Sequence, residues 1–171
     1  TLETKPEKAI KLEKDALAQI ETITADNARL VSNLHANLGG LYRMNGHPDL
    51  AREHMEKSIS LLDQFNLLHI NDSIPQIANY AMFLTEQQEP ERGISELQKL
   101  SGIIKEYHSD DCLDYAKVQE TLGTIYLMTA NLPQAKTHFK RAFKIYEKIW
   151  ADEPEMIEAK YQEIETVRKS L

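Results

Sequence analysis

Three five-residue stretches, spaced at equal intervals, decide the fold of this 171-residue chain. They are Leu38-Gly39-Gly40-Leu41-Tyr42, Tyr80-Ala81-Met82-Phe83-Leu84 and Leu122-Gly123-Thr124-Ile125-Tyr126. The stretches begin 42 residues apart and align without a gap. Twelve residues after the small residue of each stretch comes another small residue, followed four later by a large apolar one: Ala51 and Met55, Gly93 and Leu97, Ala135 and Phe139. The chain therefore contains an internal repeat of 42 residues.

Apolar residues within each repeat follow helical spacing, interrupted once by turn residues. The interruptions are Asn45-Gly46-His47-Pro48, Gln88-Glu89-Pro90 and Asn131-Leu132-Pro133. Proline suits the first turn of a helix and cannot continue the preceding one, so each repeat is predicted to be a helical hairpin. Ser73 and Asp111 are predicted to cap the helices that follow them. Valine occurs only three times and no segment alternates with period two, so no sheet is predicted.

The recurring small residues predict close contact between the two helices of each hairpin. A glycine inside a helix costs roughly 1 kcal/mol relative to alanine, so its recurrence requires a packing reason. Where two helices cross closely, a small residue lets the backbones approach, and a facing large residue fills the remaining space. We expect three facing pairs across the hairpins: Gly39 and Ala51, Ala81 and Gly93, Gly123 and Ala135.

This pattern resembles the tetratricopeptide repeat (TPR), whose motif is W-x2-L-G-x2-Y, then A-x3-F, then P. Here it takes the form His35-x2-Leu38-Gly39-x2-Tyr42 with Ala51-x3-Met55. The tryptophan position holds His35, Ile77 and Gln119, and the closing proline is replaced by Asp63, Lys105 and Glu147. The 42-residue length is similar to the long repeats of kinesin light chains. The resemblance implies an all-α fold, a right-handed α-solenoid of antiparallel helical hairpins.

The segments on either side of the clear repeats extend this organisation. We expect a single TPR-like domain over residues 1–171, forming part of a larger array. Its predicted parts are the second helix of a truncated earlier repeat (5–23), three repeats (27–66, 73–107 and 111–151) and a capping helix (154–170). The last segment places Tyr161, Ile164 and Val167 on one face and charged residues elsewhere, which suits a helix that covers the apolar end of a solenoid.

Composition excludes several classes of partner. The net charge of −7 argues against duplex nucleic acid, because phosphate binding needs a basic surface. The longest apolar run, Tyr80 to Leu84, is five residues, far short of the ~18 that a membrane-spanning helix needs. No signal peptide is recognisable. The single cysteine, Cys112, agrees with a reducing compartment, so a cytoplasmic location is expected.

The resemblance implies that the first helix of each hairpin lines a concave groove that binds a peptide. The residues expected to line it are Asn33, Asn37, Gly40, Arg43, Met44, Asn79, Met82, Glu86, Lys117, Thr121, Thr124 and Met128. Asn37, Asn79 and Thr121 stand 42 residues apart. An asparagine amide both donates and accepts, so it can pair with the backbone of an extended peptide; an ordinary solvated surface is the alternative. The methionines suit varied apolar groups, or else pack between repeats.

Catalytic and metal-binding patterns are not found in the sequence. There is no glycine-rich phosphate loop, nucleophile elbow or paired-carboxylate motif, so no enzyme and no cofactor is predicted. The histidines never pair at i, i+4 with each other, and the one such spacing to Cys112, from His108, falls in a polar loop between hairpins, so no metal site is predicted. The carboxylate clamp of chaperone-binding relatives matches at only two of five positions, which read Ala36, Gly40, Asn79, Lys117 and Thr121.

Two functional hypotheses remain from the sequence. The first is a scaffold that binds an extended peptide or helix of a partner protein in the concave groove. The alternative is a regulatory or oligomerisation module of a larger multidomain protein, which senses a peptide or forms a homodimer. A lysine stripe, Lys136, Lys140, Lys144 and Lys148, is interpreted as solvated outer surface, with an acidic partner or nucleic acid as the alternative.

Overall fold

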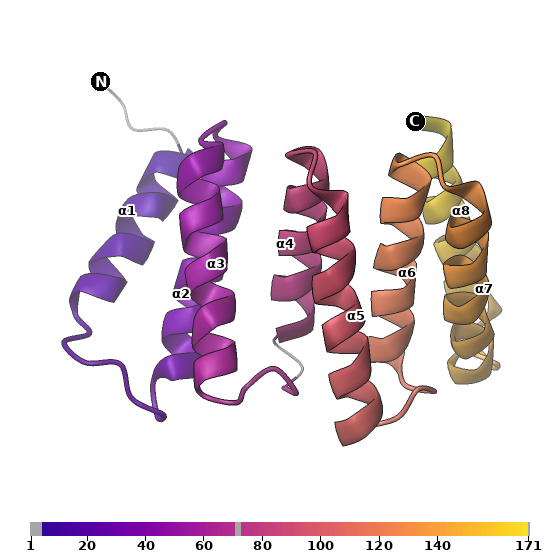
Figure 1. Ribbon diagram of the computed structural model, residues 1–171, viewed down its shortest axis with the longest axis horizontal. Coiled ribbons are helices and arrows are strands. Elements are labelled where there is room, and N and C mark those ends of the chain that lie inside the picture. Colours follow the sequence, from indigo (N-terminus) through magenta and orange to yellow (C-terminus); the bar gives the residue numbers. More distant parts are fainter. Residues whose placement is uncertain (1–4, 71–72, 171) are drawn as a thin grey trace. The chain divides into compact units, whose positions relative to one another are not determined.

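The described part of the chain is all-helical. A computed structural model describes residues 5–70 and 73–170, apart from the side chains of Val167 and Ser170. These residues form eight helices and no strand (Figure 1), which confirms the predicted fold class. The helices are α1 (Lys5–Ala18), α2 (Ala28–Met44), α3 (Pro48–Gln64), α4 (Ser73–Glu86), α5 (Pro90–Tyr107), α6 (Leu113–Met128), α7 (Leu132–Ile149) and α8 (Pro154–Ser170). None of the helices in these residues is both long and apolar enough to cross a membrane.

The chain divides into two compact units, Thr1–Tyr80 and Ala81–Leu171, with the boundary inside α4. The first unit contains α1, α2, α3 and the beginning of α4, and the second contains the remainder of α4 with α5 to α8. Helix α1 ends at Ala18, before the expected residue 23, in a region where the β-branched residues Thr22, Ile23 and Thr24 disfavour a helix. The single-domain organisation stays a prediction.

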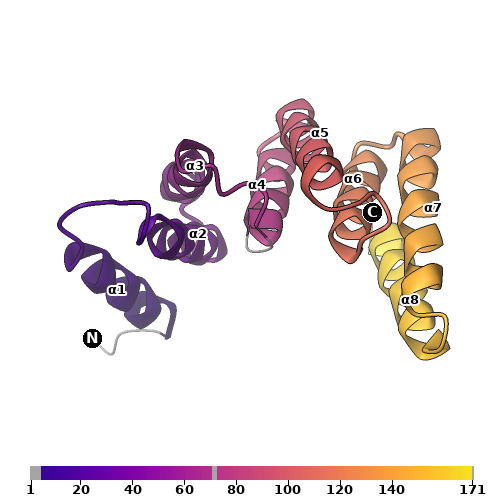
Figure 2. The same cartoon turned by 90° about the horizontal axis from the view of Figure 1, so that it is seen from below.

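In the first unit, α2 and α3 form a closely packed hairpin (Figures 1 and 2). Leu38, Ala51 and Leu62 are fully buried between or beneath the helices. A Cβ atom added to Gly39 would lie 2.6 Å from Met55 Cγ and 3.3 Å from the carbonyl oxygen of Ala51. Gly39 therefore faces Ala51 as predicted. A larger side chain does not fit at this crossing, which explains the glycine.

The second unit repeats this packing. A Cβ atom on Gly93 would lie 2.6 Å from the carbonyl oxygen of Ala81, so the predicted facing of these two residues is confirmed. Gly123 faces the ring of Phe139, the equivalent of Met55, and two of its atoms would lie 2.8 Å from an added Cβ. The predicted facing of Gly123 and Ala135 stays a prediction.

The three hairpin turns have the same backbone conformation at equivalent positions. Gly46, Gln88 and Ala130, each 42 residues apart, have φ angles of 73°, 65° and 58°. Proline lies in the first turn of α3, α5 and α7. A backbone N–H at this position has no acceptor within the helix, so proline, which lacks the N–H, loses no hydrogen bond there. The turn geometry is therefore conserved along the chain, although only the first turn uses a glycine at the left-handed position.

The two predicted helix caps are wrong. The Ser73 hydroxyl donates backward to the carbonyl oxygens of Leu68 and Ile70, at 2.6 and 2.7 Å, because Ser73 is already the first residue of α4. Helix α6 is capped by Cys112, whose Sγ accepts a hydrogen bond from the Tyr115 backbone N–H at 3.4 Å. The Asp111 carboxylate is bound by the Lys148 ammonium group and is not available as a cap.

Candidate functional site: a polar pocket on the first helices

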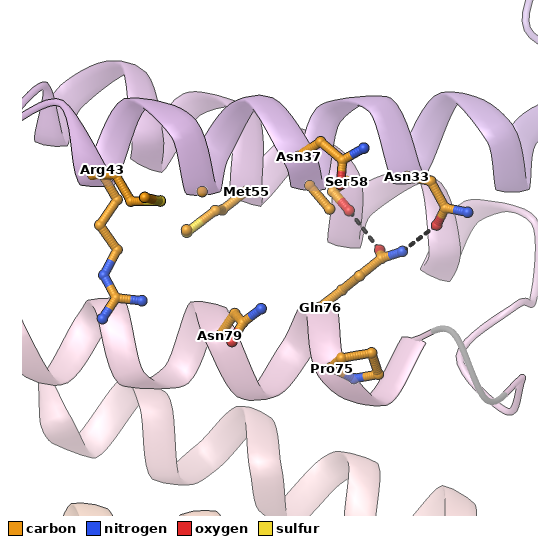
Figure 3. A pocket seen from close by; sticks show the side chains of 11 residues that line it. Asn33, Asn37, Arg43, Met55, Ser58, Pro75, Gln76 and Asn79 are labelled. Atoms are coloured by element: carbon orange, nitrogen blue, oxygen red, sulfur yellow. Dashed lines mark hydrogen bonds between the residues drawn. The ribbon is translucent and has the colours of Figure 1, made fainter. Parts of the chain in front are cut away.

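A pocket of about 560 Å³ lies in the first unit, between α2, α3 and the beginning of α4 (Figure 3). It is lined by Asn33, Ala36, Asn37, Gly40, Arg43, Met44, Met55, Ser58, Pro75, Gln76 and Asn79. Six of these were predicted from the sequence as groove residues: Asn33, Asn37, Gly40, Arg43, Met44 and Asn79. The structure thus brings together every predicted groove residue that belongs to this unit.

Helix periodicity explains why these residues share one face. Leu38, Gly39 and Tyr42 are buried in the hairpin, so residues on the opposite side of α2 point away from it. Gly40 is part of that opposite side, and a Cβ atom added to it would meet nothing within 4 Å. Unlike Gly39, it is not required by helix packing, and the missing side chain instead leaves the pocket open.

Gln76 closes one end of the pocket through a network of hydrogen bonds. Its Oε1 accepts from the Ser58 hydroxyl at 2.7 Å, and its Nε2 donates to Asn33 Oδ1 at 2.5 Å (Figure 3). The same Oε1 accepts from the Ser32 hydroxyl at 2.9 Å. Ser32 and Ser58 are fully buried, so their hydroxyl groups depend on such partners. The network fixes the Asn33 amide with its oxygen occupied and its NH₂ group left as a donor.

The other polar groups of the pocket are less constrained. Asn37 Nδ2 donates to Glu13 Oε1 of α1 at 2.9 Å. Asn79 is exposed and forms no hydrogen bond with the residues that the structure describes. The Arg43 guanidinium lies beside α4, and the flexible side chain of Met55 contributes an apolar wall (Figure 3). The pocket therefore offers amide donors and acceptors and one cation around apolar surface.

The predicted groove residues of the second unit do not form a comparable pocket. Met82, Thr121 and Thr124 line a cavity of about 200 Å³ with residues of α6 and α8. The Thr121 hydroxyl donates to the Lys117 carbonyl oxygen of its own helix, at 3.0 Å. Glu86, Lys117 and Met128 line neither of these two cavities. A role for these six residues in binding stays a prediction.

Sequence analysis missed Gln76 and the contact between two histidines. Gln76 has no counterpart in the following repeat, where Val118 stands 42 residues later, so periodicity gives no signal for it. His35 Nδ1 and His54 Nδ1 lie 2.8 Å apart across the hairpin, a contact that a search for i, i+4 pairs within one helix cannot find. Burial and the neighbouring charges of His54 and Lys57 lower the pKa of His35 to about 4.

Comparisons with known proteins agree with this architecture. Residues 73–148 match the Tetratricopeptide repeat family. The crystal structure of BtubC (BKLC) from P. vanneervenii is similar, with a TM-score of 0.72 and 20% sequence identity. The match covers 84% of this chain and 56% of that one, so this chain spans just over half the length of that protein and shares its fold. No curated protein matches significantly in sequence.

Helical hairpins repeated every 42 residues, with small residues at the helix crossings, define an all-α repeat protein. Residues 73–148 match the tetratricopeptide repeat family, and the fold shared with the solved structure agrees with that match. The resemblance inferred from the repeat motif is thereby confirmed for these residues.

Proposed function

We propose that the chain is a protein-interaction module that binds an extended peptide or a helix of a partner protein along its first helices. Tetratricopeptide repeats generally mediate protein–protein interaction. The main observation in support of the proposal is the pocket of the first unit, which is lined by six of the expected groove residues. We retain the cytoplasm as the proposed location, since Cys112 is a free thiol.

The chemistry of the pocket favours a peptide as its ligand. An extended backbone presents alternating donors and acceptors, which the Asn33 NH₂ group and the Asn79 amide can match. Met44, which is 80% exposed, and Met55 offer flexible apolar contacts. Arg43 adds a cation that suits a carboxylate. We therefore expect a segment with small or apolar side chains and an acidic group near Arg43.

Filling the pocket tests this proposal directly. In the variant Gly40→Leu the new side chain enters the pocket, and helix packing is unaffected because no atom lies near the Cβ position. Gly102→Leu is the matched control, since Gly102 also lies within a helix and has open space around its Cβ position. Peptides selected on the wild type from a random phage-displayed library are then measured on both variants by fluorescence anisotropy.

We expect the main class of selected peptides to bind Gly40→Leu at least about tenfold more weakly, and Gly102→Leu unchanged. Equal binding of every selected peptide to the two variants would contradict the proposal. Circular dichroism of both variants shows whether the helices are intact.

The asparagine positions are tested separately with Asn37→Ala and Asn79→Ala. Because Asn37 also binds Glu13, the variant Glu13→Ala serves as a control that removes this contact without changing the pocket lining. We expect both asparagine variants to weaken peptide binding several-fold. If Asn37→Ala and Glu13→Ala have the same effect, Asn37 acts only by holding α1.

A further inference from the structure

A second groove lies in the second unit, between α7 and α8, with a volume of about 780 Å³. Its apolar lining includes Leu132, Phe139 and Phe143 of α7 and Tyr161 and Ile164 of α8. Leu132 and Tyr161 remain 61% and 45% exposed, although both are large and apolar. Helix α8 was expected to cover the apolar surface at this end of the repeats. Instead, α7 and α8 form a hydrophobic groove between them.

Polar and aromatic contacts attach helix α8 to α6 and α7 and position the two walls of the groove. The Lys160 ammonium group binds Glu120 of α6 at 3.1 Å, and the Tyr146 hydroxyl donates to the same carboxylate at 2.5 Å. Tyr161 stacks on Phe143 of α7, with ring centroids 3.9 Å apart and an interplanar angle of 7°. Figure 2 shows α8 alongside α7. The groove is thus preorganised for a ligand.

The repeat register indicates that the groove has the place of a helix. Ile164 and Glu165 of α8 stand 42 residues after Leu122 and Gly123 of α6, so α8 is in phase with the first helices of the hairpins. In the α6–α7 hairpin, the Gly123 face of the first helix is covered by the second helix through Phe139. On α8, the equivalent face lines the groove. A helix is therefore the form of ligand that this groove fits.

The charged residues along the groove indicate the charge of the helix that it binds. Lys136, Lys140 and Lys144 lie along its α7 edge, in a chain with a net charge of −7. Arg168 on the other edge is already paired with Glu165. Lys136 and Lys140 form no ion pair with any residue in the described part of the chain. Lys136, Lys140 and Lys144, expected to be ordinary solvated surface, thus border an apolar groove whose lining has four basic and two acidic residues. Lys148, the fourth lysine of the stripe, pairs with Asp111 and does not line the groove.

We propose that the α7–α8 groove binds an amphipathic, acidic helix of a partner protein. The apolar face of that helix packs on Phe139, Phe143 and Tyr161, and its carboxylates pair with Lys136 and Lys140. The lining residues of α7 run from Leu132 to Glu147, which corresponds to roughly 22 Å at 1.5 Å per residue, so a helix of about 15 residues fills it. This surface is separate from the pocket in the first unit and does not depend on the function proposed for it.

A pair of synthetic peptides tests the proposal. One is a fluorescently labelled amphipathic helix of about 15 residues with a leucine face flanked by glutamates; the other has the same leucine face flanked by lysines. Binding to the full chain is measured by fluorescence anisotropy at low and high salt. We expect the acidic peptide to bind at least about tenfold more tightly than the basic one, and to weaken as salt is added.

Matched variants locate the binding. Lys136→Glu/Lys140→Glu should weaken the acidic peptide at least about tenfold, because two attractive contacts become repulsive. Lys8→Glu/Lys11→Glu, which makes the same change in net charge at exposed positions of α1, should leave its affinity within about twofold. Leu132→Ala removes an exposed apolar contact and should weaken binding several-fold without unfolding the chain.

Three results would overturn the proposal. The first is equal binding of the acidic peptide to the two double-charge variants. The second is equal binding of the acidic and basic peptides to the wild type, which would show that charge does not select the ligand. The third is a concentration-dependent dimer in analytical ultracentrifugation that Lys136→Glu/Lys140→Glu abolishes, since the groove would then belong to a second copy of this chain.

Discussion

The α2–α3 and α6–α7 hairpins are two copies of one repeat, 84 residues apart, that share an apolar framework and differ in their polar contacts. The tryptophan position of the motif holds His35 in one and Gln119 in the other. In the first hairpin, His35 Nδ1 lies 2.8 Å from His54 Nδ1; in the second, His138 Nδ1 lies 2.9 Å from Gln119 Oε1. The fold accommodates either pair. Two histidine nitrogens at this distance must share one proton between them, whereas a histidine N–H can donate to an amide oxygen whether the ring is neutral or protonated.

The same two hairpins hold the next helix by different means. Ser32, Ser58 and Gln76 form a neutral hydrogen-bonded network between α2, α3 and α4. The equivalent residues 84 positions later are Ala116, Ala142 and Lys160, and there Lys160 pairs with Glu120. The repeat therefore specifies the hairpin, while the residues between hairpins decide how each following helix is attached.

The largest expected effect concerns the two helix crossings. Gly39→Leu should destabilise the chain by about 3 kcal/mol or more, because backbone atoms of α3 lie next to the new side chain. Gly123→Leu should cost about half as much, since its nearest neighbour is the Phe139 ring, which can move into the open α7–α8 groove. Urea denaturation followed by circular dichroism measures both. Equal losses would show that the crossings are equally rigid.

The second prediction breaks the polar network of the first hairpin. Gln76→Leu alone should cost about 2 kcal/mol, because the buried Ser58 hydroxyl loses its Gln76 acceptor and the buried Ser32 hydroxyl keeps only its contacts with Ser58. The triple variant Ser32→Ala/Ser58→Ala/Gln76→Leu should recover most of this loss, since it replaces the whole network by apolar groups, as at Ala116 and Ala142. A triple variant less stable than Gln76→Leu in urea denaturation would contradict this account.

The third prediction concerns acid. The pKa of His35 is about 4 in the folded chain and near 6.5 when unfolded, so the unfolded chain binds more protons between these values. Stability is complete above pH 6.5 and falls as the pH decreases towards 4, by about 1–2 kcal/mol for this half-buried ring. Urea denaturation at neutral and mildly acidic pH measures the loss.

Exchanging the residues at the tryptophan position between the two hairpins provides the control for the acid prediction. His35→Gln copies the second hairpin and should reduce the loss of stability in acid, whereas Gln119→His creates a second pair of histidines and should increase it. Some sensitivity remains in both variants, because burial also lowers the pKa of His138. An unchanged dependence on pH in both variants would mean that the histidine contact does not control acid stability.

The smallest expected effect concerns the turns. Gly46 and Ala130 occupy equivalent left-handed positions, with φ of 73° and 58°, and only glycine adopts this conformation without cost. Gly46→Ala should destabilise the first hairpin by about 1 kcal/mol, and Ala130→Gly should stabilise the other by about half as much. Thermal unfolding of the two variants checks the opposite signs. A shift in the same direction for both would contradict the shared turn geometry.

The sequence predicted the helices well because each hairpin is built from local signals. Periodic apolar residues, the prolines after each turn and the small residues at Gly39, Ala81 and Gly123 act within a single repeat. Which residues share one face of a helix follows from helical spacing, so the α2 face of the pocket could also be predicted from Asn33 to Met44. The cap predicted at Asp111 failed because its carboxylate binds Lys148, a contact across 37 residues.

Features that depend on contacts between repeats could not be predicted. Gln76 becomes central only because two buried serines on another hairpin need an acceptor, and no spacing rule relates these residues. The lysine stripe was predicted as outer surface because its helix was considered alone, whereas α8 brings Tyr161 and Ile164 beside it. Repeat periodicity thus predicts the hairpins but not the polar contacts that join them.

The central claim, that the pocket of the first unit binds a peptide, is tested most directly by two-dimensional nitrogen–proton NMR. A peptide selected on the wild type is added to labelled protein, and the side-chain amide signals of Asn33, Gln76 and Asn79 are followed with the backbone signal of Gly40. The account predicts that these signals shift together and saturate with the peptide, while the Gly102 signal stays in place. Saturable binding that leaves all four signals unmoved would contradict it.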